Sequence, residues 1–99
     1  MADVEATLQR LSNHKGVLGC VVVDKQGKVL RTTCEAAITE QYANLIPDLA
    51  ELARGTVRDL DPLNDLQFLR IRSKKTEIMV APRPDFVLMA IQDPKTVET

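Results

Sequence analysis

The chain has 99 residues, of which 44% are hydrophobic and 27% charged, values typical of one small folded domain rather than a disordered or fibrous chain. A balance of 13 basic against 14 acidic residues creates no broad positive field for nucleic acid or anionic lipid. No apolar run approaches the roughly 20 residues that cross a bilayer, and the acidic N-terminus lacks the layout of a signal peptide. We therefore expect a single domain over residues 1–99, located in the cytoplasm and without membrane insertion.

The first predicted element is a helix from Val4 to about His14, and Gly16 supplies a left-handed residue that can end it. Val4, Leu8 and Leu11 recur at helical spacing, so they form one narrow apolar stripe along this helix. The stripe can either pack on a face of the chain's own sheet or contact another protein.

Two strands are predicted next, joined by a short turn. Val17–Asp24 is apolar enough to lie between two covered faces, whereas Val29–Thr33 alternates as a strand nearer the sheet edge does. A three-residue turn would place Cys20 opposite Thr32, and Cys34 would then lie diagonally, with Cβ atoms about 7–8 Å apart against roughly 3.8 Å in a disulfide. A two-residue turn would put the cysteines on opposite faces. We expect thiols in either case, and the single histidine leaves too few ligands for zinc.

The segment Thr39–Asp59 predicts a long helix with Thr39 as its N-cap. When each residue is advanced by about 100°, the apolar side chains cover an arc of about 180°, whereas one core contact needs roughly 100°. One side of the helix can therefore cover the sheet while the other still needs a partner. Pro47 removes a hydrogen bond to the carbonyl of Ala43, which predicts a kink in one continuous helix, with two separate helices as the alternative.

Three further strands are predicted at Leu66–Arg72, Glu77–Ala81 and Phe86–Gln92, joined by short turns in an antiparallel meander. The last of them is apolar on both faces, so it belongs in the middle of a covered sheet. The element order α-β-β-α-β-β-β predicts an α+β fold, in which one five-stranded antiparallel sheet has helices on its faces.

The sequence holds no motif that indicates an enzyme. Its 4 glycines are scattered and form no phosphate-binding loop, and no nucleophile, metal-ligand or redox motif occurs. We therefore expect no catalysis, no cofactor and no metal. The one basic cluster consists of Arg70, Arg72, Lys74 and Lys75, and acidic residues lie nearby in sequence. This pattern favours ion pairs at a subunit seam over phosphate binding.

The wide apolar arc and an open sheet edge predict self-association about a two-fold axis. Helix Thr39–Asp59 would pack against its twin, and strand Leu66–Arg72 would pair edge to edge with its copy. The expected interface combines side chains of this helix with side chains of this strand: Tyr42, Leu45, Ile46, Leu49, Leu52, Ala53, Thr56, Leu66, Phe68, Arg70 and Arg72.

Short segments between positions 41 and 92 form a pattern that covers much of the chain. They are Gln41-Tyr42-Ala43, Thr56-Val57-Arg58-Asp59-Leu60-Asp61-Pro62, Asn64-Asp65-Leu66, Phe68-Leu69-Arg70-Ile71-Arg72-Ser73-Lys74-Lys75, Glu77-Ile78-Met79-Val80-Ala81-Pro82 and Ile91-Gln92. This pattern resembles the roadblock-type dynein light chain family. The resemblance implies the roadblock fold and a homodimer formed through the second helix and the third strand. Pro47 departs from the family pattern, which leaves open a pairing with a close paralogue instead.

The resemblance also implies a function without catalysis. A light-chain dimer of this family binds a short segment of the dynein intermediate chain, and through it joins two heavy-chain assemblies in microtubule-based movement. Such segments typically dock as amphipathic helices. The stripe Val4, Leu8 and Leu11 is the candidate for this contact, with packing on the chain's own sheet as the alternative.

Two other functions remain open. Other roadblock-domain proteins work on small GTPases, so a scaffold or regulator of such a switch is one alternative. A ligand-sensing domain is another, and it would need a concave apolar pocket with a few polar groups. The resemblance implies the cytoplasm and the cytoskeleton as the location, and it does not decide between cytoplasmic dynein and the axoneme of a cilium or flagellum.

Overall fold

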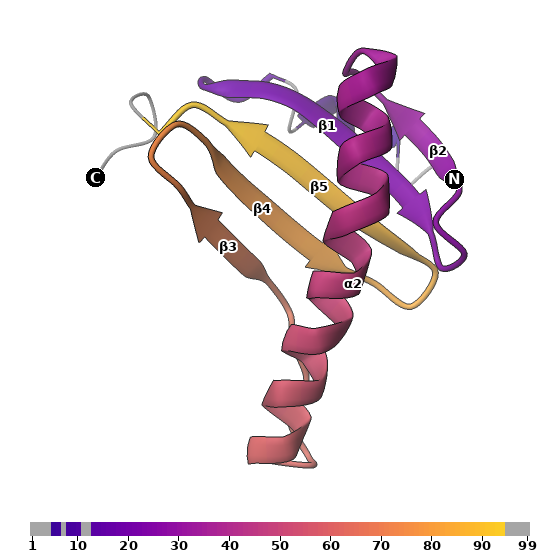
Figure 1. Cartoon of the computed structure of the whole chain (residues 1–99), viewed down its shortest axis with the longest axis vertical. Helices are drawn as coiled ribbons and strands as arrows, with labels where there is room; N and C mark the ends of the chain where they lie inside the picture. Colours follow the sequence, from indigo (N-terminus) through magenta and orange to yellow (C-terminus); the bar gives the residue numbers. More distant parts are fainter. Residues whose placement is uncertain (1–4, 7, 11–12, 95–99) are drawn as a thin grey trace.

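A computed structural model describes residues 5–6, 8–10 and 13–94 of the chain. Its elements are β1 (Val17–Asp24), β2 (Val29–Thr32), α2 (Ala36–Leu60), β3 (Leu69–Arg72), β4 (Glu77–Pro82) and β5 (Phe86–Gln92), and residues 5–6 and 8–10 are helical. The five strands form one sheet in the order β2-β1-β5-β4-β3, and every neighbouring pair is antiparallel (Figure 1). The predicted α+β class is confirmed, as are the central position of β5 and the edge position of β2.

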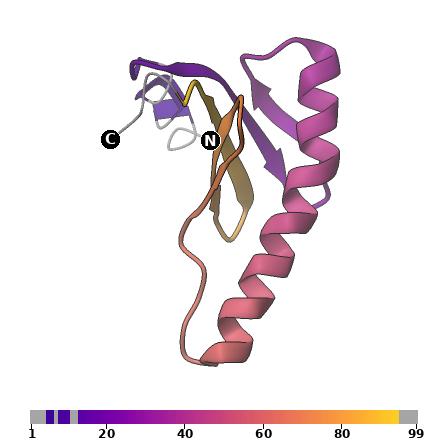
Figure 2. The same ribbon diagram turned by 60° about the vertical axis from the view of Figure 1, so that its left-hand side comes forward.

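The sheet has two apolar faces, because its middle strands carry large side chains on both sides. On the inner face, which α2 covers, the core consists of Val21, Val23, Val80, Val87 and Met89 together with three helix residues. On the outer face, Leu8 packs with Cys20, Val22, Leu88 and Ala90. Figure 2 shows α2 and the described helical residues near the N-terminus on opposite sides of the sheet.

The β1–β2 hairpin differs from its predicted register by one residue. Gly27 has a φ of 87°, and the Asp24 carboxylate accepts hydrogen bonds from the N–H groups of Gln26 and Lys28. This is the expected three-residue turn, but the pairing shifts between Val22 and Val23, so Thr32 lies opposite Val21 rather than Cys20. A β-bulge adds one residue to one strand and moves all later pairs.

The two cysteines belong to different faces of the sheet. Cys20 is buried in the outer-face core, and Cys34 packs against the inner-face core. Both are thiols, as expected. The bulge therefore places the two cysteines on opposite faces of the sheet, as the alternative of a two-residue turn predicted.

Helix α2 starts at Ala36, three residues before the predicted start, and the prediction of Thr39 as its N-cap is wrong. The cap is Glu35, which makes no side-chain capping bond. Thr39 lies inside the helix and is buried, where its hydroxyl meets Thr32 Oγ1 at 2.7 Å and donates to the carbonyl oxygen of Cys34 at 3.3 Å. Threonine is common both as an N-cap and as a residue that bonds to a nearby backbone carbonyl, so the sequence alone does not distinguish the two roles.

The helix passes Pro47 without a break, so one continuous helix is confirmed over two separate ones. Its C-terminal half extends beyond the sheet, and residues 61–68 return beside it to the start of β3 (Figures 1 and 2). Strand β3 begins at Leu69, so the strand predicted from Leu66 is three residues too long. The predicted interface residues Leu66 and Phe68 therefore lie in the returning segment, outside any strand.

Candidate functional site

The outward side of α2 carries an apolar stripe that no other part of the described chain covers. Leu45 is 69% exposed, Leu49 is 40% exposed and Leu52 is 70% exposed. With Ile38, Tyr42 and Thr56 these residues alternate in steps of four and three along the helix. This is the spacing by which one helix packs against another in a coiled-coil-like seam.

The inward side of α2 belongs to the core of the same chain. Ala43, Ile46 and Ala50 are buried against the inner face, and Tyr42 packs at the edge of this cluster. Ile46, which is predicted at the interface, is thus a core residue with little surface left. Ala53 is half-buried. The predicted arc therefore splits into a half that faces the sheet and a half that faces outward.

A hollow of about 320 Å³ lies beside the stripe, where α2 leaves part of β4 uncovered. Gln41, Tyr42, Leu45, Ile46 and Ile78 line it. Burial, and secondly the neighbouring Cys34, raise the pKa of the Tyr42 phenol above its ordinary value, so this ring is neutral at physiological pH. The hollow can receive an apolar side chain from a facing helix.

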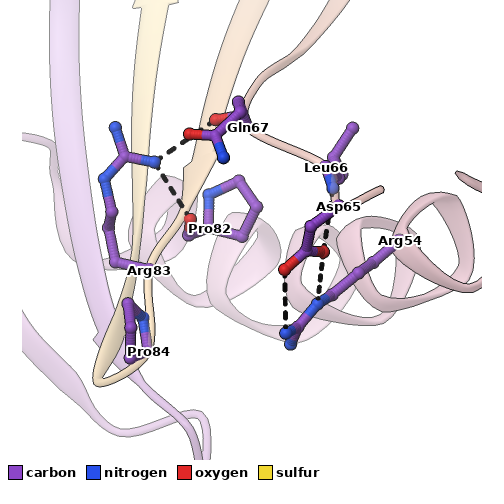
Figure 3. A pocket seen from close by; sticks show the side chains of 7 residues that line it. All are labelled: Arg54, Asp65, Leu66, Gln67, Pro82, Arg83 and Pro84. Carbon is purple, nitrogen blue, oxygen red and sulfur yellow. Dashed lines mark hydrogen bonds and ion pairs between the residues drawn. The ribbon is translucent and has the colours of Figure 1, made fainter. Parts of the chain in front are cut away.

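A clamp of charges holds the overhanging half of α2 to the returning segment (Figure 3). Arg54 donates from Nε to Asp65 Oδ1 at 2.9 Å and from a terminal nitrogen to Oδ2 at 3.2 Å, and Arg58 lies 3.5 Å from the same carboxylate. The hydrogen bond from Arg54 holds the pKa of Asp65 below its usual range, and the Leu66 N–H contributes. The same bond raises the pKa of Arg54. The clamp fixes the direction in which the stripe points.

Beside the clamp is a hollow of about 240 Å³ that Arg83 borders from the β4–β5 turn (Figure 3). The Arg83 guanidinium donates to the carbonyl oxygens of Gln67 and Pro82, at 3.2 and 3.0 Å. These bonds tie the returning segment to the sheet. Sequence reasoning missed both Arg83 and the Arg54–Asp65 clamp, because partners that lie 11 or 16 positions apart leave no local pattern.

Arg70 and Arg72 of β3 form ion pairs within their own chain. Arg70 Nε lies 2.7 Å from Glu77 Oε2, and Arg72 Nε lies 3.8 Å from Glu77 Oε1. The prediction of ion pairs is thus met by a cross-strand neighbour on β4, which shares a register position with Arg72. A role for the two arginines at a subunit seam stays a prediction.

The candidate stripe of the first helix is described only at Leu8. This side chain is 8% exposed and packs in the outer-face core, in agreement with the alternative of packing on the chain's own sheet. Val4 and Leu11 lie outside the described residues. Glu5 forms an ion pair with Arg31 of β2, which ties this region to the sheet edge.

Membrane and metal sites find no support in the described part of the chain. No helix there combines the length and the apolarity needed to cross a bilayer. Among the same residues, no three His, Cys, Asp or Glu side chains come together as ligands for an ion.

Comparison with known proteins gives a family for this fold. Residues 3–93 match the Roadblock/LC7 domain. A Roadblock/LC7 domain from Streptomyces avermitilis is similar with a TM-score of 0.78 and 15% identity, over 87% of this chain and 74% of that chain. Myxococcus xanthus MglB has a TM-score of 0.77 and 20% identity, over 99% and 81% of the two chains. The gliding protein MglB from Thermus thermophilus has a TM-score of 0.76 and 14% identity, over 96% and 74%. This chain therefore belongs to the Roadblock/LC7 domain family.

Proposed function

We propose that this protein is a non-catalytic adaptor that works as a dimer, with a partner protein bound to the paired domains. The observation that carries the proposal is the stripe of Leu45, Leu49 and Leu52, which remains exposed after α2 has covered its own sheet. Surface apolar residues that occur singly are ordinary, but a contiguous row at helix-packing spacing marks an interaction site.

A second copy of the chain is the occupant of this stripe. A two-fold axis brings the same residues of two helices together, so a self-complementary row meets itself. Tyr42 and Leu45 border both the stripe and the 320 Å³ hollow over β4, so a knob from one copy has a hole in the other. Strand β3 is an edge strand of the sheet, so it can pair with its copy. Other roadblock proteins also form dimers.

The first candidate for the partner is the dynein intermediate chain, and through it the heavy chain. Support comes from the residue pattern of positions 56–92, which resembles roadblock-type dynein light chains. This pattern occupies the end of α2, the returning segment and the strands β3 to β5, which surround the clamp and the sheet edge. Under this candidate the protein works in microtubule-based movement, in the cytoplasm or in the axoneme of a cilium or flagellum.

The second candidate is a small GTPase for which the dimer acts as scaffold or regulator. The comparison favours it, because the similar solved structures include bacterial MglB and MglC proteins. At 14–20% identity these structures support the same fold for this chain, but they do not identify its partner. We therefore place the dynein candidate first, on the residue pattern.

Affinity isolation separates the two candidates. The tagged chain is recovered from ciliated and from non-ciliated cells, and its companions are identified by mass spectrometry. Intermediate and heavy chains of dynein, in stoichiometric amounts, would support the first candidate. A nucleotide-loaded GTPase without motor subunits would support the second. A tagged L45E/L52E variant is the matched control, since a partner that needs the paired domains is lost with the dimer.

A further inference from the structure

On the outer face of the sheet, the described residues bury the side chains of β5 more completely than those of β4. Leu88 and Ala90 of β5 are buried together with Leu8, whereas Met79 of β4 is only half-buried. Phe68, which lies directly before β3 and two positions before Arg70, is 46% exposed. Apolar surface therefore remains exposed beside the β3–β4 part of the outer face, where the Arg70 guanidinium lies against Met79.

The same area carries an excess of positive charge. Glu77 is 2% exposed, and it is the carboxylate on which both Arg70 and Arg72 converge. Two half-exposed guanidinium groups therefore share one buried carboxylate, and Lys74 and Lys75 follow in the β3–β4 turn. Arg72 also donates to the carbonyl oxygen of Pro94 at 3.1 Å. Arginine presents several donors in a planar fork, so the donors that remain on the two guanidinium groups can bind a further carboxylate.

The floor of this area is polar and already enclosed. Glu77 and Gln92 are register partners on β4 and β5, so the two side chains lie on the same face of the sheet. Both are buried, and Arg70 compensates the charge of the Glu77 carboxylate from 2.7 Å. The surface that a partner could contact is therefore formed by the half-exposed arginines above them.

We propose that this outer-face site, formed by Phe68, Arg70, Arg72 and Met79 above the buried Glu77, docks an acidic amphipathic helix of the partner protein. Its carboxylates would pair with the two arginines, and its apolar side would cover Phe68 and Met79. A helix suits the site because helical segments already pack on both faces of this sheet, α2 on the inner face and the helical residues around Leu8 on the outer face. This inference rests on the proposed adaptor function, and it places the partner opposite the face that α2 covers.

A triple variant, R70Q/R72Q/E77Q, tests the site without leaving an unpaired charge in it. It removes two positive charges and one negative charge, and K28Q in the exposed β1–β2 turn changes the net charge by the same amount. Binding of full-length dynein intermediate chain is measured by titration calorimetry at low and high salt, with sedimentation of each variant as a check on the dimer. We expect the triple variant to bind at least tenfold more weakly and K28Q to bind as the wild type does. Equal affinity and equal salt dependence in all three would overturn the site.

A second probe separates this site from the identity of the partner. It is a synthetic amphipathic helix with a leucine stripe flanked by glutamates, and its counterpart carries lysines in place of the glutamates. The glutamate helix should bind the wild type and not the triple variant, and the lysine helix should bind neither. If the intermediate chain fails to bind the wild type while the glutamate helix binds as expected, the dynein candidate falls and the site stands. A glutamate helix that binds both proteins equally overturns the site.

Oxidative footprinting decides the question in the wild type, should the triple variant fail to fold. Hydroxyl radicals modify exposed aromatic and thioether side chains, and Phe68 and Met79 offer both. The comparison is between the dimer alone and the dimer saturated with the glutamate helix. Reduced oxidation at Phe68 and Met79, with unchanged oxidation at Tyr42 on the α2 side of the sheet, is the expected result. Unchanged oxidation at Phe68 and Met79 contradicts the proposal.

Discussion

Gly19 leaves room for the Cys34 side chain at the link between the sheet and the long helix. A Cβ added there would lie 2.5 Å from Cys34 Sγ, well inside the normal contact distance, at the point where the chain leaves β2 for α2. We predict that G19A lowers the free energy of unfolding by roughly 1–3 kcal/mol, as overpacking of a tight site does. Urea unfolding at fixed protein concentration measures it.

Two controls identify the cause of that loss. In a C34A background the clash partner is absent, so G19A should cost much less there than in the wild type. G55A, on an open stretch of α2 with nothing within 4 Å, should stabilise by roughly 0.5–1 kcal/mol through helix propensity. An equal cost of G19A in both backgrounds would show that the contact with Cys34 is not responsible.

The free energy of unfolding should depend on the protonation of Asp65. Its pKa is lowered in the folded state by the hydrogen bond from Arg54. A carboxylate with a depressed folded pKa stabilises the fold above its unfolded pKa, and this contribution is lost as the pH falls through the folded pKa. D65N should therefore be less stable than the wild type at pH 7, and the difference should shrink below about pH 4. Urea unfolding across this range measures it, and a difference that stays constant with pH would contradict the clamp.

At the scale of elements, the helical wheel of α2 predicted the width of its apolar face but not its division. Periodicity places Leu45, Ile46 and Leu52 on one broad arc, and only the crossing angle of the helix on the sheet decides that Ile46 is buried. The start of β3 was missed for a related reason. Asp65 accepts from the Leu66 N–H, and Arg83 binds the carbonyl of Gln67, so side chains occupy backbone groups that a ladder would use.

The stripe on α2 gives the prediction for this element. L45E/L52E places two charges at the centre of the proposed seam, where each lost leucine contact is worth roughly 2 kcal/mol in a packed interface. The dissociation constant of the dimer should therefore rise by roughly 100-fold or more. Both positions are exposed in the single chain, so the circular dichroism spectrum of the variant should match that of the wild type.

Leu63 provides the matched control, because it is 98% exposed in the turn after α2 and lies outside the stripe. L63E should leave the dissociation constant unchanged. Sedimentation velocity of the three proteins over a range of concentrations makes the comparison. A double variant that associates as tightly as the wild type would show that the stripe is not the seam.

At the scale of the whole molecule, the local pattern predicted which strands lie in the middle of the sheet and the meander of the last three strands, whereas the complete strand order and the contacts that position the functional surfaces are long-range. The buried runs of β1 and β5 could occupy only the middle of a sheet, and that is where they lie. The pairing of Glu77 with both Arg70 and Arg72 needed the register of β3 on β4. Surfaces for partners depend on such placements, so they emerge only from the folded chain.

The central claim is that α2 has more apolar surface than one copy of the chain can cover, so two copies meet. Sedimentation equilibrium of the purified wild type at micromolar concentration tests it most directly. The account predicts a particle of about 22 kDa, twice the 11.0 kDa of one chain, that dissociates only on dilution. A particle that remains at 11.0 kDa over the whole concentration range would contradict it.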